Sequence, residues 1–386
     1  MDAIKASVLE KLIRELCPEG VEYRELSELF KTKNGYTPSK GNKEFWENGN
    51  IPWFRMDDIR QNGGILSHAL QNVTEKAVKG ELFPENSLIV ATTATIGEHA
   101  LITVPSLANQ QFTCLSLKEE YKNQFVIKFL YYYCFKLDEY CKKNLNQGSL
   151  ASVDRGKFSK FKFPLPPLPI QQEIVRILDT FTNLTAELTA ELTARRKQYE
   201  YYRDELLTFG EDVPRMTLRD ISVSVSSGKN KEKEQEGMYP VYGSTGVIGR
   251  TNTAKYSKEQ ILVARVGANA GFVHKANGTY DVSDNTIIVE LKDNYNLQYV
   301  YYILQKMNLR KYAKGGGQPL VTAGELKKIE IPIPDINEQD RVVSILDKFT
   351  GISTSFDSGL PAEIAARQKQ YEYYRERLLS FKESHR

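Results

Sequence analysis

The chain has 386 residues, 41% of them hydrophobic and 26% charged, with a formal net charge of +3. This length predicts two or three domains, each with a core of its own. No apolar run reaches the ~20 residues of a membrane span, and the charged N-terminal segment is no signal peptide, so we expect a cytoplasmic protein without contact to a membrane.

Cofactor and metal motifs are absent from the sequence. The four cysteines form no C-x-x-C pair and there are only four histidines, which argues against a zinc site. The chain has neither a G-x-x-x-x-G-K-[ST] loop for ATP nor a dinucleotide fingerprint. It also lacks the adenine-methyltransferase tetrapeptide of Asn or Asp, two prolines and an aromatic residue. We therefore expect no catalytic residue, no metal site and no cofactor in this chain.

The chain begins with a helix and a mixed domain. Residues 1–20 have the apolar spacing of an amphipathic helix. In the following segment, 21–166, the β-branched runs at 87–97 and 112–117 predict strands. A Tyr-rich helix follows them, and the domain closes with a short strand that ends in prolines.

A long helix follows in residues 167–209. Its apolar residues recur at steps of three, four and seven, which marks one helical stripe. The middle of this segment is the tandem sequence LTAELTAELTA, and its end, 195–209, reads RRKQYEYYRDELLTF.

The net charge of the whole chain is too small to decide for or against a nucleic-acid partner.

The second half of the chain repeats the first. The sequence RQKQYEYYRERLLSF at 367–381 copies the helix end of the first half, and VSILDKFTGI at 343–352 copies VRILDTFTNL at 175–184. A repeat of this kind organises the whole fold. We therefore expect a second mixed domain in 210–334 and a second helical segment in 335–386.

The second helical segment is expected to be interrupted. Proline is tolerated in the first turn of a helix and not in its interior. Because Pro361 follows the sequence SGL, we expect a break near 357–360 and a new helix from Pro361.

The narrow apolar stripes of both helical segments predict pairing with another helix. An antiparallel coiled coil between the two mixed domains is the arrangement we expect; packing of each helix on its own domain is the alternative. The predicted fold class is therefore α+β, with two domains, a coiled coil and a pseudo-two-fold repeat that the N-terminal helix completes. The predicted pairing residues are Leu184, Leu188, Leu192, Tyr199, Tyr202, Leu206, Phe356, Leu360, Ile364, Tyr371, Tyr374 and Leu378.

These motifs resemble those of a known family. The duplicated architecture, the PLPIQQEI entry into the helix, the ILDxFT box, the TAEL tetrads and the RKQYxYYRxxLL helix are similar to those of specificity subunits of type I restriction–modification systems. The resemblance covers essentially the whole chain. The second tetrad region, STSFDSGLPAEI at 353–364, departs from TAEL, so it does not define the length of the spacer that such tetrads set in relatives.

The resemblance implies a function without catalysis. Two target recognition domains would each read half of a bipartite, asymmetric double-stranded DNA sequence, and the coiled coil would dock two methyltransferase subunits. Restriction and translocation subunits would complete the enzyme. S-adenosylmethionine, ATP and magnesium are then expected on these partners and not on this chain.

Basic and polar segments are the candidates for DNA contact, since lysine and arginine bind phosphates and Arg, Asn and Gln reach base edges. Each of these residues is equally explained as a solvated surface or turn group, and Arg265, inside a strand-like run, as part of a buried salt bridge. The DNA-binding candidates are Lys31, Lys33, Lys40, Lys43, Arg55, Arg60, Gln61, Asn62, Lys142, Lys143, Arg155, Lys157, Lys160, Arg250, Asn252, Arg265, Asn269, Lys311, Lys314 and Gln318.

Two other functions are compatible with parts of the sequence. The chain would keep the same fold as the specificity subunit of a type II system with a fused nuclease and methyltransferase. A free-standing nuclease is the third interpretation, but no acidic cluster with the spacing of a metal site supports it.

Overall fold

The computed structural model describes residues 2–146, 151–231, 234–315, 319–353 and 359–384. The chain divides into two compact units: unit 1 comprises residues 1–186 and 366–386, and unit 2 comprises residues 187–365. Within the described ranges, no helix has the length and apolar character needed to cross a membrane.

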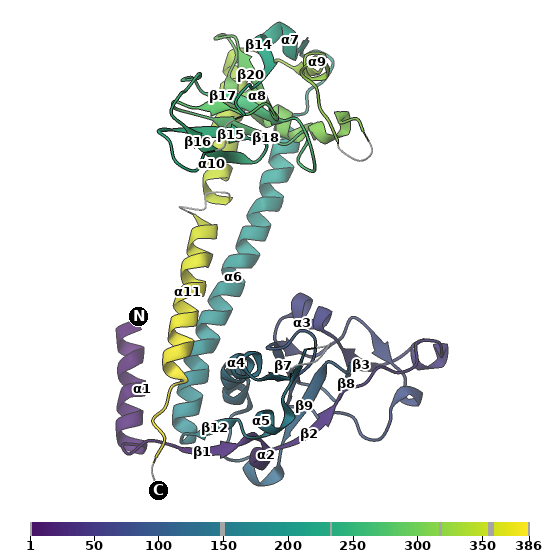
Figure 1. Ribbon diagram of the computed structural model, residues 1–386, viewed down its shortest axis with the longest axis vertical. Helices are drawn as coiled ribbons and strands as arrows, with labels where there is room; N and C mark the ends of the chain where they lie inside the picture. Colours follow the sequence, from purple (N-terminus) through teal and green to yellow (C-terminus); the bar gives the residue numbers. More distant parts are fainter. Residues whose placement is uncertain (1, 147–150, 232–233, 316–318, 354–358, 385–386) are drawn as a thin grey trace. The chain divides into compact units, whose positions relative to one another are not determined.

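Unit 1 is built on a mixed sheet of five strands in the order β2-β9-β6-β7-β4. All five residues of the central strand β6 are buried, because α4 (Ile127–Lys143) covers one face of the sheet and a smaller sheet lies toward the other (Figure 1). The strands are β2 (Phe30–Asn34), β4 (Ile65–Leu66), β6 (Ser87–Ala91), β7 (His99–Ile102) and β9 (Phe112–Leu117).

The smaller sheet of unit 1 has the order β5-β3-β8. It comprises β3 (Ile51–Phe54), β5 (Asn72–Val73) and β8 (Leu107–Ala108), with α3 (Met56–Asn62) after β3. Two short ladders, β1 (Glu22–Glu25) with β12 (Lys162–Leu165) and β10 (Leu145–Asn146) with β11 (Ser152–Val153), complete the strands. The short helices are α2 (Leu26–Leu29), η1 (Lys43–Phe45), η2 (Glu75–Ala77), η3 (Glu119–Tyr121) and α5 (Arg155–Ser159).

Unit 2 repeats this plan with a sheet in the order β14-β20-β17-β18. Helix α8 (Leu297–Lys306) packs on this sheet as α4 does in unit 1 (Figure 1). The strands are β14 (Ser222–Ser227), β17 (Gln260–Ala264), β18 (Val273–Ala276) and β20 (Thr286–Leu291). The tandem mixed domains of the predicted α+β fold are therefore confirmed.

The remaining elements of unit 2 differ more from those of unit 1. A separate sheet has the order β16-β15-β19, with β15 (Tyr239–Gly243), β16 (Gly246–Thr251) and β19 (Asp281–Val282). Strand β13 (Arg215–Thr217) pairs with β21 (Glu330–Pro332) as β1 pairs with β12. The short helices are α7 (Leu218–Ile221), η4 (Leu309–Tyr312) and α9 (Ala323–Leu326).

Long helices leave both domains. Helix α6 (Leu168–Leu206) is continuous over 39 residues, whereas the second segment forms α10 (Ile336–Ser353) and α11 (Leu360–Leu378). The predicted restart at Pro361 is confirmed to within one residue, with Gly359 in the left-handed region at φ 83° just before it. The predicted pairing residue Phe356 lies outside the described residues.

A buried glutamine holds each long helix to its domain in the same way. Gln171 accepts a hydrogen bond from the Val126 backbone at 2.8 Å and donates to the Pro166 carbonyl at 2.7 Å. Gln339 accepts from the Asn296 backbone at 3.0 Å and donates to the Pro334 carbonyl at 2.8 Å. Since a buried amide must be hydrogen-bonded, both glutamines fix the angle at which the helix leaves the domain.

In each unit the start of one long helix packs against the end of the other. Phe181 stacks on Tyr374 in unit 1 with ring centroids 5.3 Å apart, and Phe349 stacks on Tyr202 in unit 2 at 5.2 Å. In unit 1, Lys162 also contacts Glu383 at 2.8 Å, so the two segments run antiparallel there. The expected antiparallel pairing is thereby confirmed, and the first turns of α6 also pack on the core of unit 1 through Ile170 and Ile174.

The predicted pairing stripe has the expected burial. Each of its residues that the structure describes is half-buried, and these residues alternate with exposed neighbours such as Tyr201 and Tyr373, which are 65% and 60% exposed. Helix α1 (Asp2–Leu16) lies against the core of unit 1 through Leu9 and contacts α11 through an ion pair of Glu10 and Arg377 at 3.3 Å.

Candidate nucleic-acid interface

Unit 1 has a polar cavity of about 760 Å³ beside its edge strand. Strand β2, the loop after β6, the β10–β11 ladder and the start of α5 line it. Most of the polar side chains around it are uncharged donors and acceptors, which is the composition that base edges require. The polar lining residues are Ser27, Thr32, Asn34, Thr92, Thr93, Gln110, Thr113, Asn146, Ser152, Asp154, Arg155 and Ser159.

A chain of hydrogen bonds orders the floor of this polar cavity. Thr113 donates to Asn34 Oδ1 at 3.1 Å and lies 2.9 Å from the Thr92 hydroxyl. The Thr113 proton is thus committed to Asn34, and the Thr92 hydroxyl donates to Thr113. This leaves the Asn34 amide group and the Thr92 oxygen as a donor and an acceptor toward the cavity. The one lining carboxylate, Asp154, accepts from the Lys157 backbone at 3.0 Å and caps α5.

The same backbone position in unit 2 carries an arginine. The Thr92 amide donates to the Gln111 carbonyl at 2.9 Å, and the Thr92 carbonyl accepts from Val153 at 2.9 Å. The Arg265 amide donates to the Asn285 carbonyl at 2.9 Å, and its carbonyl accepts from Val321 at 2.8 Å. Thr92 and Arg265 therefore occupy equivalent places directly after β6 and β17.

Arg265 is half-buried, and its guanidinium makes one long hydrogen bond, 3.4 Å to the Asp284 carbonyl. Within the described ranges no carboxylate lies within ion-pair distance of it, so the alternative of a buried salt bridge finds no partner there.

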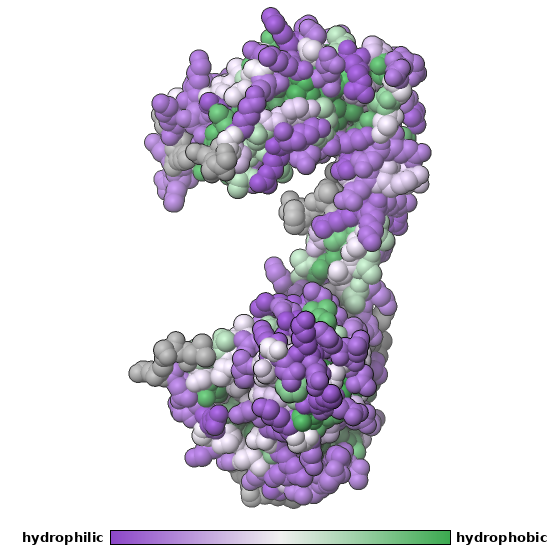
Figure 2. Space-filling view, turned by 90° about the vertical axis from the view of Figure 1, so that its right-hand side faces the viewer, coloured by the Kyte–Doolittle hydropathy of each residue, from purple (hydrophilic) through white to green (hydrophobic). Residues whose placement is uncertain are grey.

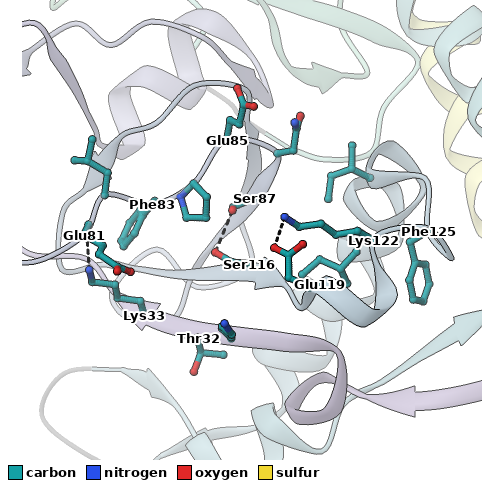
Figure 3. A pocket seen from close by; sticks show the side chains of 16 residues that line it. Thr32, Lys33, Glu81, Phe83, Glu85, Ser87, Ser116, Glu119, Lys122 and Phe125 are labelled. Carbon is teal, nitrogen blue, oxygen red and sulfur yellow. Dashed lines mark hydrogen bonds and ion pairs between the residues drawn. The ribbon is translucent and has the colours of Figure 1, made fainter.

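The basic residues of β2 lie on the other side of the sheet. Side chains alternate along a strand, so Thr32 and Asn34 face the polar cavity while Lys31 and Lys33 point away. Lys33 donates to the Glu81 carbonyl at 2.5 Å in a second pocket, where Lys122 pairs with Glu119 at 2.6 Å (Figure 3). Carboxylates in this second pocket offset its lysines, so the pocket is less suited to binding phosphate than its lysines alone would suggest.

Other basic candidates of unit 1 gather near the polar cavity. Arg155 lines it, and Lys157 and Lys160 are exposed on the adjoining turn. Lys142 lies across Gly97, where an added Cβ would come 2.1 Å from the Lys142 Cε, so this lysine packs on the loop that follows β6. Lys143 is exposed in the last turn of α4.

The remaining candidates of unit 1 lie around the smaller sheet. Arg55 stacks over Trp53 at 5.6 Å and lies 3.9 Å from Asp57. Asn62 donates to the His68 carbonyl at 3.4 Å. The exposed candidates there are Lys40, Lys43, Arg60 and Gln61.

Two of the DNA-binding candidates in unit 2 make hydrogen bonds to the backbone of a nearby loop. Arg250 donates to the carbonyls of Gly237 and Met238 at 2.6 and 2.9 Å, and Asn252 accepts from the Met238 backbone at 3.3 Å. Both side chains thus fix the loop before β15.

The other candidates of unit 2 lie at the surface. Lys314 pairs with Glu325 at 2.7 Å, and this hydrogen bond raises the pKa of Lys314. Lys311 lies over the Tyr312 ring at 5.2 Å, and Asn269 lines a hollow of about 840 Å³ beside Arg203. The candidate Gln318 lies outside the described residues.

The surface and the titratable groups give no sign of a catalytic centre in the described part of the chain. No group of three His, Cys, Asp or Glu side chains there is placed to hold a metal ion. Hydrophilic residues cover most of the face of each unit that Figure 2 shows.

A family model for the type I restriction modification DNA specificity domain matches residues 18–195 and 211–366. The chain is 47% identical over 371 residues to the type I restriction enzyme EcoprrI specificity subunit of Escherichia coli, covering 90% of this chain and 92% of that one. It is 32% identical over 409 residues to a putative type I restriction enzyme specificity subunit of Haemophilus influenzae, covering 97% and 98%.

Two solved structures share the fold. The S subunit of a type I restriction–modification system from M. genitalium matches with a TM-score of 0.57 at 16% identity, covering 93% of this chain and 95% of that one. A chain from a study of complex assembly in the type I R-M system matches with a TM-score of 0.58 at 14% identity, covering 94% and 98%.

Proposed function

This chain belongs to the family of type I restriction–modification specificity subunits, and we propose that it reads a bipartite, asymmetric double-stranded DNA site, one half with each mixed domain. A specificity subunit is not the catalytic subunit of its system. The domain bounds that go with this proposal are 1–20 for the N-terminal helix, 21–166 and 210–334 for the recognition domains, and 167–209 and 335–386 for the helical segments.

One observation carries this proposal: the same scaffold occurs twice with different hydrogen-bonding side chains at an equivalent position. The backbone contacts of Thr92 and Arg265 correspond bond for bond, while one side chain is a neutral hydroxyl and the other a cation. A protein that binds two different half-sites needs this combination, because the scaffold sets the position and the side chain selects the base.

The DNA backbone would be bound by exposed cations around the polar cavity and by their counterparts in unit 2. Phosphate contacts place a protein on the duplex and make its affinity depend on salt. The residues proposed for this role are Lys142, Lys143, Arg155, Lys157 and Lys160 in unit 1, with Lys311 and Lys314 in unit 2. Lys314 would exchange its contact with Glu325 for a phosphate.

The helices would bind the partner subunits. Tyr201 and Tyr373, at equivalent places in the two RKQYxYYR segments, keep most of their ring surface exposed. Large exposed aromatic side chains on a helix favour protein interfaces. We propose that two methyltransferase subunits dock on these two segments, that restriction subunits join them in the cytoplasm, and that S-adenosylmethionine, ATP and magnesium bind to those partners.

Reconstitution tests this function. The purified chain alone should transfer no methyl group and hydrolyse neither ATP nor DNA. Together with its methyltransferase partner it should direct adenine methylation to one bipartite sequence. Methyl transfer by the isolated chain, or methylation without sequence preference by the complex, would contradict the proposal. Co-purification with one fused nuclease–methyltransferase polypeptide would instead favour a type II system.

A further inference from the structure

The two residues that directly follow β6 and β17 are held more firmly than a surface loop requires. In unit 1 the bridge between Thr93 and Ser152 extends the contacts of Thr92, and in unit 2 the bridge between Val266 and Leu320 extends those of Arg265. Both backbone groups of Thr92 and of Arg265 are hydrogen-bonded to neighbouring strands. A side chain on such a fixed backbone loses little entropy when it binds a ligand.

The Arg265 guanidinium has more N–H donors than it has acceptors among the described residues. Its one hydrogen bond within the described ranges is the 3.4 Å contact to the Asp284 carbonyl, at the limit of hydrogen-bond length. The Arg265 side chain is only partly buried, so an external group can approach it. A half-buried arginine that has neither a carboxylate partner nor a complete set of acceptors is poised to bind an external acceptor.

The charged groups described near Arg265 are hydrogen-bonded or ion-paired with other partners. The carboxylate of Asp284, whose backbone carbonyl accepts from Arg265, itself accepts from the Ser283 hydroxyl at 3.5 Å. Across the neighbouring turn, Lys314 and Glu325 neutralise each other at 2.7 Å. Among the described residues the guanidinium therefore has no fixed counter-charge, in a place where unit 1 has a neutral hydroxyl.

On the basis of the proposed function, we propose that Arg265 is a specificity-determining residue that reads a guanine in the half-site bound by unit 2, and that Thr92 with Asn34 reads an adenine at the equivalent place in the other half-site. Guanine offers O6 and N7 as paired acceptors in the major groove, which fit the arginine fork. The Asn34 amide donor and the acceptor oxygen beside it match the N7 and N6 groups of adenine.

The test compares the DNA motif methylated by the reconstituted complex with single substitutions. Arg265→Thr should remove the guanine preference at one position in one half-site, by about 5- to 150-fold, the equivalent of ~1–3 kcal/mol. Arg265→Gln should shift the preference at that position toward adenine, since glutamine pairs with adenine in the same groove. Thr92→Val, which keeps the side-chain shape, should relax one position in the other half-site only.

A matched control separates base reading from general attraction. Arg219 is an exposed cation of unit 2 on α7, away from the Arg265 position, so Arg219→Thr removes the same charge. That variant should keep the motif and lower affinity equally for all sequences, if it changes affinity at all. The folded state of each variant is checked by its melting temperature before the motifs are compared.

Two results would overturn the inference. An unchanged motif with Arg265→Thr would show that Arg265 reads no base, and an equal loss for every sequence would show that it binds phosphate. Both results leave the proposed function standing, because the wild-type complex still yields a bipartite motif. Failure of the wild-type complex to yield such a motif would remove the proposed function itself.

Discussion

The two units are alike where the helices meet the domains, and they differ in side-chain chemistry at the position that borders the polar cavity in unit 1. At the helix junction, Asp179 accepts a hydrogen bond from Tyr132 and Asp347 accepts one from Tyr302, with aromatic stacks of nearly equal spacing beside them. At the equivalent position directly after β6 and β17, unit 1 has Thr92 and unit 2 has Arg265. The two halves of the repeat therefore share the contacts that attach the helices to the domains, whereas the side chains at the proposed binding surface differ.

The largest effect is expected from breaking the helical stripe of α6. Two residues inserted after Leu192 turn everything beyond them by ~200°, so the stripe no longer continues on one face. Methylation by the reconstituted complex should be lost. A TAEL insertion at the same place turns the stripe by only ~40° and adds ~6 Å, so both half-sites should survive with the unread gap longer by about one or two base pairs.

The methylated motif of each variant decides this point. The four-residue insertion is the control for the two-residue one, because both lengthen the same helix. An unchanged gap after the TAEL insertion would mean that α6 does not set the spacing.

Matched leucines at the two helix junctions test whether the units are equally stable there. Leu207 and Leu379 are 3% and 1% exposed and belong to the cores of unit 2 and unit 1. Leu207→Ala and Leu379→Ala should each lower the free energy of unfolding by ~2–5 kcal/mol, through lost burial and the cavity left behind. Denaturant unfolding measures both. A loss of unfolding free energy in only one of the two variants would show that the two helix junctions are not equally important for stability.

A half-buried histidine whose ring nitrogens are shielded from water should make unit 2 sensitive to acid. His274 has two ring nitrogens without a partner among the described residues, and burial lowers its pKa from 6.5 to about 4. The folded state thus resists protonation, and the stability present above pH 6.5 is lost as the pH falls toward 4. The loss should be on the order of 2–3 kcal/mol.

His274→Phe keeps the stack with Tyr242 and Phe272 and removes the titration. Unfolding free energies at pH 7 and pH 4.5 should then differ by less in this variant than in the wild type. An equal pH dependence in both proteins would show that folding does not lower the pKa of His274.

The smallest effect concerns the junction aspartates. Asp179 accepts from the Lys128 ammonium at 2.7 Å as well as from Tyr132, whereas Asp347 accepts from the neutral Gln298 at 3.1 Å and from Tyr302. Hydrogen bonds between charged groups are the stronger ones, but partial exposure of Lys128 weakens this one. Asp179→Asn should therefore cost ~1 kcal/mol more than Asp347→Asn in thermal unfolding. Equal costs would show that the charge adds nothing.

Sequence periodicity predicted the helical segments well, because their boundaries and apolar stripes depend on residues that are close together in sequence. The restart near Pro361 follows from proline stereochemistry alone, and the half-buried stripe follows from spacing. The polar cavity was not predicted, since Asn34, Thr92 and Thr113 come from three strands or loops that only the sheet brings together. The match of SLIVATTATIG with QILVARVGANAG did contain a signal, because it aligns Thr92 with Arg265.

Charge alone was a poor guide to the interface. A run of lysines suggests one basic surface, yet strand alternation puts Lys31 and Lys33 on the face away from Asn34. Arg250 had the residue type of a base reader, but its guanidinium donates to two backbone carbonyls. These roles depend on partners distant in sequence, which periodicity does not reveal.

An exchange of one recognition domain tests the central claim most directly. Residues 213–331 are replaced by the equivalent segment of a relative with another target, and the motif methylated by the reconstituted complex is sequenced. Two domains that read independently should give a motif in which one half-site changes to that of the relative while the other half-site stays the same. A change in both half-sites would contradict the claim that each domain reads its own half.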